Sequence, residues 1–384
     1  MGEAWIVEAV RSPVARADPQ KGAFRHVRPD DLAGNVLASL VARAKANPAL
    51  IEDVLLGCVR QQGEQGFNIA RQAVLLAGFP QEVCGVTVNR NCGSSLEALH
   101  QAARAIRAGE ADLLIAGGVE HLDRAGWEVR PDLSPAMLQR FPADSFHMGL
   151  ICEFLGREKG ISRAEQDEFA QRSHEKAAAA TKAGLFQDEI IPILGHAPEG
   201  ASTRISQDQT IRLGSTLAAL ADLKPAFLPE GTITAGNASP LSVGAAAILL
   251  ASEKKCQELG VKPVARVTAM AVTGIDPLHM GLGPVSAMQK VVQKAGLTME
   301  QVEIIEINEA FAVQTLAVVK ELSLPMEKVN QWGGAIALGH PLGATGARMT
   351  TTAVHAMKRT GARFALLAMC IGGGQGMATL LEKA

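Results

Sequence analysis

The chain has 384 residues, of which 47% are hydrophobic and 20% charged, and its formal net charge is −2. This length suits two or three domains rather than one core, and the composition is that of a globular protein. The near-neutral charge, without any run of basic residues, excludes a general attraction for nucleic acid or for an anionic membrane surface.

The six cysteines and the chain start indicate the compartment. The cysteines are dispersed and none forms a C-x-x-C pair, which is typical of a reducing cytosol and gives no zinc or redox motif. The start MGEAWIVEAVRSP lacks a signal-peptide pattern, and the longest apolar run, GAAAILLA, is too short to cross a bilayer. We therefore expect a cytoplasmic protein with no transmembrane segment and no metal.

Helical and strand-like segments alternate along the first third of the chain. Residues 31–45 predict a helix with Asp30 or Asp31 near its cap, and residues 54–59 and 111–120 predict buried strands. Such alternation indicates α/β layers around a largely buried sheet.

The middle of the chain has a different texture. From about residue 121 to 240, polar turns and prolines surround helices that are predicted over 163–183 and 215–222. We interpret this stretch as a less regular insertion between two α/β units.

The two ends of the chain resemble each other. Residues 50–59 (LIEDVLLGCV) match residues 298–307 (TMEQVEIIEI) at an offset of 248, which predicts two copies of one α/β unit. The same offset relates Cys92 to His340. If the copies pack about a pseudo-twofold axis, a cysteine from one unit faces a histidine from the other.

Cys92 stands in NCGSSLEALHQAAR, just before a predicted amphipathic helix. The free N–H groups and partial positive charge of a helix start favour a thiolate, which is the nucleophilic form of cysteine. The alternative is a small buried hydrophobic residue, as most free cysteines are.

Three more polar residues stand on predicted loops at strand ends. His340 lies in the glycine-rich GGAIALGHPLGATGAR, which is followed by a helix predicted over about 344–358, and Cys370 comes just after the strand FALLAM, beside glycines. Asn308 follows the strand VEIIEI. Taken singly, each has a structural alternative: a satisfied core histidine, a buried strand-end cysteine and a helix N-cap. Together they indicate a nucleophile activated by a histidine, with a second thiol for acid–base work.

These motifs resemble the thiolase family over essentially the whole chain. The segments that carry the resemblance are VEAVRSPVAR, GEQGFNIARQAVLLAGFP, VNRNCGSSLEALHQAAR, AGNASPLSVGAAA, INEAFA, GGAIALGHPLGATGAR and CIGGGQGMA. The early segments, the -GSS- after the cysteine and GGVEH are most similar to the 3-ketoacyl-CoA thiolase (acetyl-CoA acyltransferase) subunits of bacterial fatty-acid β-oxidation complexes.

The resemblance implies an α/β thiolase fold. Two similar halves, each with a mixed five-stranded sheet, would form a layered α-β-α-β-α core that carries an inserted loop domain. The first half would cover residues 1–120 and be completed by about 241–256, the loop domain would cover 121–240, and the second half 257–384.

The resemblance also implies roles for five residues. Cys92 would be the nucleophile that becomes acylated, and His340 the base that takes its proton. Cys370 would carry protons to and from the acetyl-CoA carbanion and the incoming CoA thiol. One oxyanion hole would be His340 with a water held by Asn308, and the other would be the backbone N–H groups of Cys92 and Gly372.

Coenzyme A contacts follow from the same resemblance. Arg212 matches a family arginine near the nucleotide end, and Ser239 matches a serine beside the pantetheine arm. The residues that match the lining of the acyl and pantetheine tunnel are Phe227, His147, Met148, Ala310 and Phe311. Where the family usually has Asp before GAAA and Thr-Ala before Glu, this chain has Val243 and Ile151-Cys152, and its 121–152 loop is atypical. Acyl chain length is therefore left open.

The implied activity is thiolytic cleavage of 3-oxoacyl-CoA by CoA, with CoA as a substrate and no cofactor. The implied assembly is a homodimer or tetramer, with a hydratase/dehydrogenase α subunit as a possible partner. Biosynthetic acetyl-CoA C-acetyltransferase is the alternative with the same chemistry. A decarboxylating ketoacyl synthase fits less well, because a second cysteine stands in the glycine loop. A catalytically silent CoA- or lipid-binding protein is opposed by the retention of all four polar positions.

Overall fold

The computed structural model describes residues 2–126 and 132–384. The segment 127–131, which belongs to the 121–152 loop singled out above as atypical, lies outside the described residues. Among the described residues, no helix is both long and apolar enough to cross a membrane.

The first α/β half contains a five-stranded mixed sheet in the order β4-β3-β5-β8-β1. Its strands are β1 (Ala4–Arg11), β3 (Asp53–Gly57), β4 (Cys84–Val88), β5 (Leu113–His121) and β8 (Ser242–Ser252), and the short β2 (Ala15–Arg16) pairs with the end of β8. The strands β3, β4 and β5 are parallel, whereas β8 is antiparallel to both β5 and β1. β5 is buried along its whole length, as expected for a central strand with helices on both faces.

The second half repeats this pattern with one difference. Its strands, in the order β10-β11-β12-β9, are β9 (Ala265–Gly274), β10 (Ile304–Ile307), β11 (Phe364–Ile371) and β12 (Gln375–Lys383). The fifth position is taken by an isolated parallel bridge from Ile305 to Val329, because residues 326–329 turn instead of extending. A short pairing of Trp5 and Ile6 with β9 joins the two sheets.

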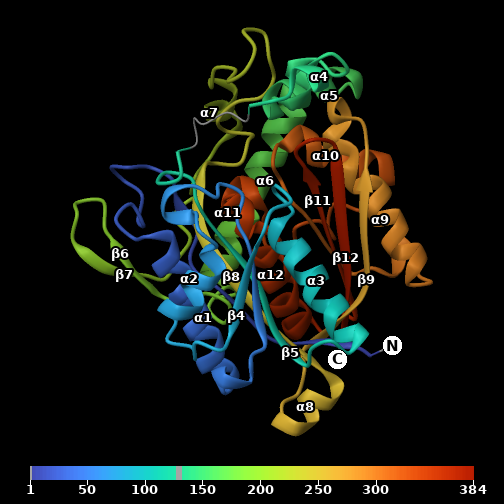
Figure 1. Cartoon of the computed structure of the whole chain (residues 1–384). Coiled ribbons are helices and arrows are strands. Elements are labelled where there is room, and N and C mark those ends of the chain that lie inside the picture. The colour runs from blue at the N-terminus through green and yellow to red at the C-terminus, as the bar shows by residue number, and fades with distance from the viewer. Residues whose placement is uncertain (1, 127–131) are drawn as a thin grey trace.

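Helices separate and cover the two sheets in five layers (Figure 1). The outer helices of the first half are α1 (Pro29–Ala44) and α2 (Ile69–Leu76), and those of the second half are α9 (Gly283–Lys294) and α10 (Ala312–Leu322). The inner layer consists of α3 (Ser94–Ala108) and α12 (Thr345–Thr360), which contact both each other and the strands. This confirms the predicted layered α-β-α-β-α core, whereas the prediction of five strands in the second half is wrong, because β9, β10, β11 and β12 are its strands and an isolated bridge stands at the fifth position.

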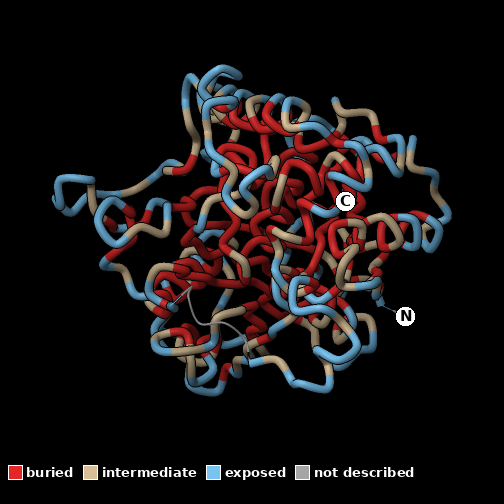
Figure 2. The backbone as a smooth tube through the Cα atoms, turned by 90° about the horizontal axis from the view of Figure 1, so that it is seen from above, coloured by how far each residue is buried: buried red, intermediate tan, exposed pale blue. Residues whose placement is uncertain are grey.

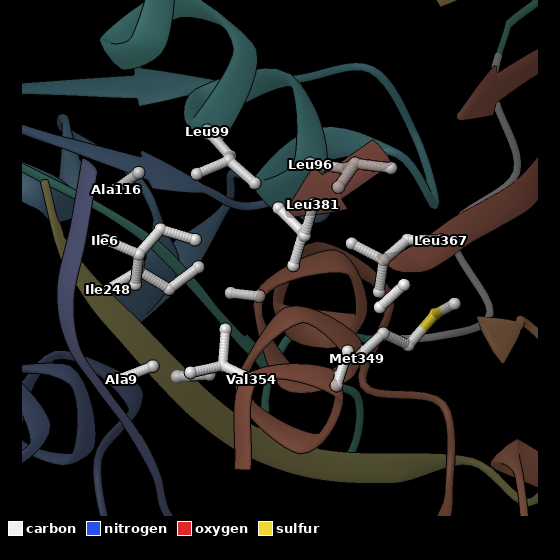
Figure 3. Close-up of a cluster of buried hydrophobic side chains, with 14 of the residues drawn as sticks. Ile6, Ala9, Leu96, Leu99, Ala116, Ile248, Met349, Val354, Leu367 and Leu381 are labelled. Carbon is white, nitrogen blue, oxygen red and sulfur yellow. The ribbon is translucent and has the colours of Figure 1, made fainter. Parts of the chain in front are cut away.

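The inner layer is held by one large apolar cluster (Figure 3). Leu96 and Leu99 of α3 share this cluster with Met349 and Val354 of α12, and strand residues such as Leu381 lie between them. Each of these side chains is at most 3% exposed. Full burial of one such side chain contributes about 1.5–3 kcal/mol, so this cluster fixes α3 and α12 relative to each other.

A long segment between β5 and β8 lies over one end of the core (Figure 1). Its helices and strands are α4 (Pro135–Leu138), α5 (Met148–Glu158), α6 (Arg163–Lys182), α7 (Leu217–Ala221), β6 (Ile193–His196) and β7 (Ser202–Ile205). The helix α6 begins at a capping box between Ser162 and Glu165, which satisfies its first N–H groups. Figure 2 shows the buried backbone at the centre of the molecule and the exposed stretches at its edge.

The remaining elements are short. They are α8 (Glu253–Leu259), α11 (Ala335–Leu338) and the 3₁₀ helices η1 (Pro48–Leu50), η2 (Gly63–Gln65), η3 (Ala143–Phe146), η4 (Pro277–Leu282), η5 (Met299–Gln301) and η6 (Leu342–Ala344).

Most of the predicted elements are confirmed within two residues of their ends. Two strand ends differ in ways that affect the site. β3 ends at Gly57 rather than at residue 59, and β11 continues to Ile371, so Cys370 lies inside this strand and not after it. Cys370 is paired with Gly376 across the β11–β12 ladder, and this pairing extends the strand.

Candidate functional site

Cys92 is held at the start of α3. It stands two residues before the first helical residue, Ser94, and Gly93 occupies the N-cap position. Side chains of the second half, Ile371 and Met377, lie within 3 Å of the position that a Cβ on Gly93 would take. The glycine therefore lets the start of this helix approach the end of β11.

The electrostatics of Cys92 differ from the expectation. Burial raises the pKa of the Cys92 thiol to about 11, although hydrogen bonds from the backbone N–H groups of Gly372 and of Cys92 itself act in the opposite direction. The direction is opposite to the expectation that the helix start keeps Cys92 as a thiolate, because loss of hydration outweighs the hydrogen bonds from these two N–H groups. A protonated thiol needs a base before it can act as a nucleophile.

His340 is a buried imidazole whose free nitrogen can accept a proton. Burial lowers the pKa of His340 to about 3, and the charge of Arg348 acts in the same direction. The Nδ1 atom lies 2.7 Å from the Thr345 hydroxyl, and the backbone N–H of His340 donates to Ser242 Oγ at 3.1 Å. The ring is therefore neutral at physiological pH and is held by its neighbours.

The hydrogen bonds of Thr345 indicate which ring nitrogen of His340 is free. The Thr345 hydroxyl donates to the carbonyl of Pro341 at 3.1 Å, so it accepts a hydrogen bond from His340 Nδ1–H. That arrangement leaves Nε2 with a lone pair, and the Asn308 side-chain amide lies 3.3 Å from it. The Nε2 atom is therefore the ring nitrogen that does not carry the proton.

Asn308 is not a helix cap. α10 begins at Ala312 with Phe311 at its N-cap position, and Asn308 instead directs its side chain at His340. Its backbone N–H donates to Ala368 of β11 at 2.9 Å, and its side-chain oxygen has no hydrogen-bond partner among the described residues. A buried amide oxygen without a protein partner is a suitable acceptor for a water molecule.

Cys370 stands close to two other thiols. Its pKa is raised well above the ordinary value by burial first, and then by the neighbouring Cys92 and Cys152. Cys152 belongs to α5, at the position where this chain departs from the usual Thr-Ala, and it packs in the same apolar cluster as Cys370. The Cys370 thiol is therefore protonated at neutral pH and can act first as an acid.

The two halves meet where α3 and α12 begin. Ser95 Oγ accepts the backbone N–H of Ala347 at 2.9 Å, and a Cβ on Gly346 would lie 2.6 Å from the backbone nitrogen of Leu96. Cys92 precedes the first of these helices and His340 precedes the second. Cys92 and His340 occupy equivalent positions in the two halves of the sequence. In the structure, each precedes one of two helices whose first turns are in contact.

The predicted acyl and pantetheine residues gather in one cluster with Cys370. This cluster contains Met148, Phe227, Ala310 and Phe311. The Phe227 ring makes edge contacts with both His147 and Phe311, at centroid distances of 5.7 and 6.0 Å.

Two contacts join this cluster to the rest of the site. The Met148 sulfur lies 3.5 Å from the position that a Cβ on Gly372 would take. Ser239 donates its backbone N–H and its hydroxyl to the carbonyl of Ala310.

Arg212 lies farther along the same loop region. Its guanidinium donates to the carbonyl of Ala235 at 3.2 Å, and its backbone N–H donates to His174. Partial burial lowers the pKa of Arg212, and the charge of Arg16 acts in the same direction. Among the described residues Arg212 has no carboxylate within salt-bridge distance, so its charge is free to meet an anionic ligand.

The residues that bind the His340 loop were not singled out from the sequence, and Cys152 was not placed beside Cys370. Ser242 and Thr345 bind that loop directly, and Glu120 accepts an N–H from Gly343 in the same loop. The signal was present, since Thr345 stands inside GHPLGATGAR and Glu120 inside GGVEH.

Val243, where the family usually has Asp, is a buried β8 residue that pairs with Ala15 and His121.

Comparison with known proteins identifies the family and agrees with the fold. Residues 4–254 match the thiolase N-terminal domain and residues 261–383 match the thiolase C-terminal domain. A structure described as the crystal structure of the Bacillus anthracis acetyl-CoA acetyltransferase aligns with a TM-score of 0.91 at 39% identity, covering 100% of this chain and 99% of that chain.

Curated relatives carry the name 3-ketoacyl-CoA thiolase. The protein of Vibrio vulnificus strain CMCP6 is 49% identical over 383 residues, which is 98% of each chain. The protein of Vibrio cholerae strain N16961 is 48% identical over 388 residues, and that of Salmonella typhimurium is 49% identical over 391 residues, each covering 100% of both chains. On its two matching domain models, its full-length relatives and its fold, this chain belongs to the thiolase family.

Proposed function

We propose that the protein is a 3-ketoacyl-CoA thiolase that cleaves 3-oxoacyl-CoA with CoA to give acetyl-CoA and a shortened acyl-CoA. The observation that carries the proposal is the contact between the starts of α3 and α12, which Cys92 and His340 precede, with Ser95 Oγ accepting the Ala347 N–H at 2.9 Å. The relatives named 3-ketoacyl-CoA thiolase support it.

The first half-reaction forms an acyl-enzyme. His340 Nε2 takes the Cys92 proton, and the sulfur attacks the C3 carbonyl of the substrate. The C2–C3 bond breaks, its electron pair stays on C2, and Cys370 donates a proton there to release acetyl-CoA. Removing a proton from a thiol of pKa about 11 is the step for which the neutral base is needed.

The second half-reaction transfers the acyl group. The Cys370 thiolate takes the proton of the incoming CoA thiol, and the CoA sulfur attacks the thioester carbon. The bond to Cys92 breaks, and the proton held by His340 returns to the Cys92 sulfur. All groups then regain their starting protonation, so no cofactor is consumed.

Two sets of donors stabilise negative oxygen in these steps. We assign one to the backbone N–H groups of Cys92 and Gly372, which already point at the thiol. The other is His340 with a water bound by Asn308, whose side-chain oxygen has no protein partner among the described residues. Hydrogen bonds aimed at developing charge in a dry site contribute several kcal/mol to catalysis.

Cys370→Ala should separate the two thiols. We expect turnover to fall about 10²–10⁴-fold, the usual contribution of an acid–base group, while Cys92 still accepts an acetyl group slowly from acetyl-CoA. Intact-protein mass spectrometry and steady-state rates measure the two effects. A folded variant that never shows the acetyl mass would contradict this division of labour.

Arg212→Ala should weaken CoA binding. The Arg212 guanidinium has no carboxylate partner among the described residues, so we expect its loss to raise the KM for CoA with a smaller effect on kcat. Arg204→Ala, which removes an exposed arginine from β7, is the control. An unchanged KM would show that the nucleotide end of CoA lies elsewhere.

The activity is tested with acyl chains of different length. Steady-state thiolysis of acetoacetyl-CoA, compared with medium- and long-chain 3-oxoacyl-CoA, should show cleavage of the longer substrates. Activity confined to acetoacetyl-CoA would favour biosynthetic acetyl-CoA C-acetyltransferase, the function named for the Bacillus anthracis structure. The absence of any turnover would favour a silent CoA- or lipid-binding protein.

A homodimer is the assembly that we propose. β4 ends the sheet of the first half, and its residues alternate between more and less exposed, with Val86 40% exposed. Phe67, which precedes Asn68 whose side chain bonds to Gly85 and Thr87 of β4, is 95% exposed. An uncovered edge strand pairs readily with another chain, and light scattering at the mass of a monomer would contradict the dimer.

The other predictions on the cellular setting are also proposals. We propose a cytoplasmic location, with which six free cysteines agree. Division into halves 1–120 with 241–256 and 257–384 around a loop domain 121–240 stays a prediction. So do tetramer formation and association with a hydratase/dehydrogenase α subunit, which co-purification from the native host tests.

A further inference from the structure

The loop that carries His340 is buried although much of it is irregular. This His340 loop, residues 334–344, contains α11 and η6, and all its residues except Leu342 are buried. Buried backbone N–H groups need partners, and an irregular loop supplies few of its own. What binds these groups therefore decides where the imidazole lies.

Glu309 binds the loop on the side before His340. It is 1% exposed, and its Oε2 atom accepts the backbone N–H of Ile336 at 3.1 Å and the hydroxyl of Ser173 at 2.7 Å. Its Oε1 atom accepts the side-chain amide of Asn330 at 2.7 Å. A Cβ on Gly334 would lie 2.1 Å from this carboxyl group, so the loop reaches it only through glycine.

Glu120 binds the loop on the side after His340. It is fully buried at the end of β5, and its Oε2 atom accepts the backbone N–H groups of Gly343 and Val59 at 2.9 and 3.0 Å. Its Oε1 atom accepts the Arg60 backbone N–H and the Gln65 side chain at 3.1 and 2.8 Å. A single carboxylate thus joins the first half of the molecule to the loop of the second half.

We propose that Glu120 and Glu309 are positioning residues for His340: two buried carboxylates, one from each half, that clamp its loop. Ile336 stands four residues before His340 and Gly343 three residues after it. The inference rests on the proposed function of His340 as a base. Neither carboxylate carries out a chemical step.

Glu120 and Glu309 must be ionised to bind the N–H groups of the His340 loop in this way. Burial raises the pKa of both groups, but hydrogen bonds to their oxygen atoms act in the opposite direction. The Oε2 atom of Glu120 accepts two backbone N–H groups, and Oε1 accepts the Arg60 N–H, the Gln65 amide and, at 4.0 Å, the Cys58 thiol. Both oxygens of an ionised carboxylate accept hydrogen bonds and neither donates one. Glutamine has the same shape, but its NH₂ group is a donor and would face the N–H donors that bind one of these oxygens.

The variants Glu120→Gln and Glu309→Gln test the clamp. We expect kcat for thiolysis to fall about 10–10²-fold with little change in the KM for CoA, because small misplacements of a reacting group carry costs of this order. Alkylation of Cys92 by iodoacetamide at pH 8 should slow in parallel, since it also depends on proton transfer to His340. Ser173→Ala removes one donor to Glu309 and, with it, the hydroxyl that accepts the Gly334 N–H of the same loop at 3.1 Å, and it should give a smaller loss in the same direction.

Glu153→Gln is the matched control. Glu153 is 1% exposed and binds the backbone N–H groups of Thr232 and Ile233, so it has the same burial and bonding without a contact to the His340 loop. It should lower thermal stability by a similar amount and leave Cys92 alkylation unchanged. If folded Glu309→Gln and Ser173→Ala enzymes alkylate and turn over like the wild type, or Glu153→Gln slows as much, the clamp is refuted. If the wild-type protein shows no thiolysis, the proposed function is refuted. The alkylation rates of Cys92 in the variants would still test whether Glu120 and Glu309 position His340.

Discussion

A Cys92→Ala variant is expected to lose thiolysis by on the order of 10⁶-fold, the scale of effect for a removed covalent nucleophile. The reason is that both half-reactions pass through the Cys92 sulfur, and no other group can form the acyl-enzyme in its place. Cys370 is buried inside β11, and its thiol pKa is raised well above the ordinary value, so it does not substitute as a nucleophile.

The control for this experiment is Cys256→Ala. Cys256 is a buried thiol in α8, where it packs in the outer core of the first half. Steady-state thiolysis of a 3-oxoacyl-CoA compares the two variants at equal fold, checked by circular dichroism. Normal activity in the Cys92 variant, or loss of activity only in the Cys256 variant, would exclude Cys92 as the nucleophile.

A His340→Ala variant should lose about 10⁴-fold, the upper range for an acid–base group, because His340 also belongs to an oxyanion hole. The pKa values give the pH dependence its sign. Burial raises the pKa of the Cys92 thiol to about 11 and lowers that of His340 to about 3, so at pH 7 both groups are neutral. The proton moves from the thiol to Nε2 as the sulfur attacks, and the opposite charges that develop on the two groups stabilise each other. Without the base, only thiolate formed by solvent can react.

The pH profile of Cys92 alkylation checks this assignment. In His340→Ala the rate should rise about tenfold per pH unit below the pKa of the thiol, because the thiolate fraction rises in that way. The wild type should react faster at neutral pH and depend less on pH. His355→Gln, at a buried histidine in α12 that binds the carbonyl of Ala9, is the control. Identical profiles for His340→Ala and the wild type would show that His340 is not the base.

The fold could be predicted from the sequence because its pattern is repeated and strongly periodic. The helix over 31–45, the strand over 111–120 and the matching ends of the chain each depend on local apolar spacing, and each is confirmed by α1, β5 and the two sheets. The extension of β11 past Cys370 was not predicted, because the ladder to β12 depends on a distant segment.

The site was predictable as a set of residues but not in its electrostatics. Asn308 lies beside His340, and Cys370 beside Cys92, as the motifs indicate. The expected charge state of Cys92 differs from the direction of its pKa. The sequence shows a helix start but not the burial that raises the pKa of the thiol. The clamp by Glu120 joins residues 223 positions apart, and no local pattern reveals such a contact.

The acyl-enzyme on Cys92 is tested most directly by intact-protein mass spectrometry after incubation with acetyl-CoA. Wild-type protein should gain the mass of one acetyl group, which peptide mapping should place on Cys92, and added CoA should remove it. The Cys92→Ala variant should show no gain under the same conditions. An acetyl group on any other cysteine, or its presence in the Cys92→Ala variant, would contradict the mechanism.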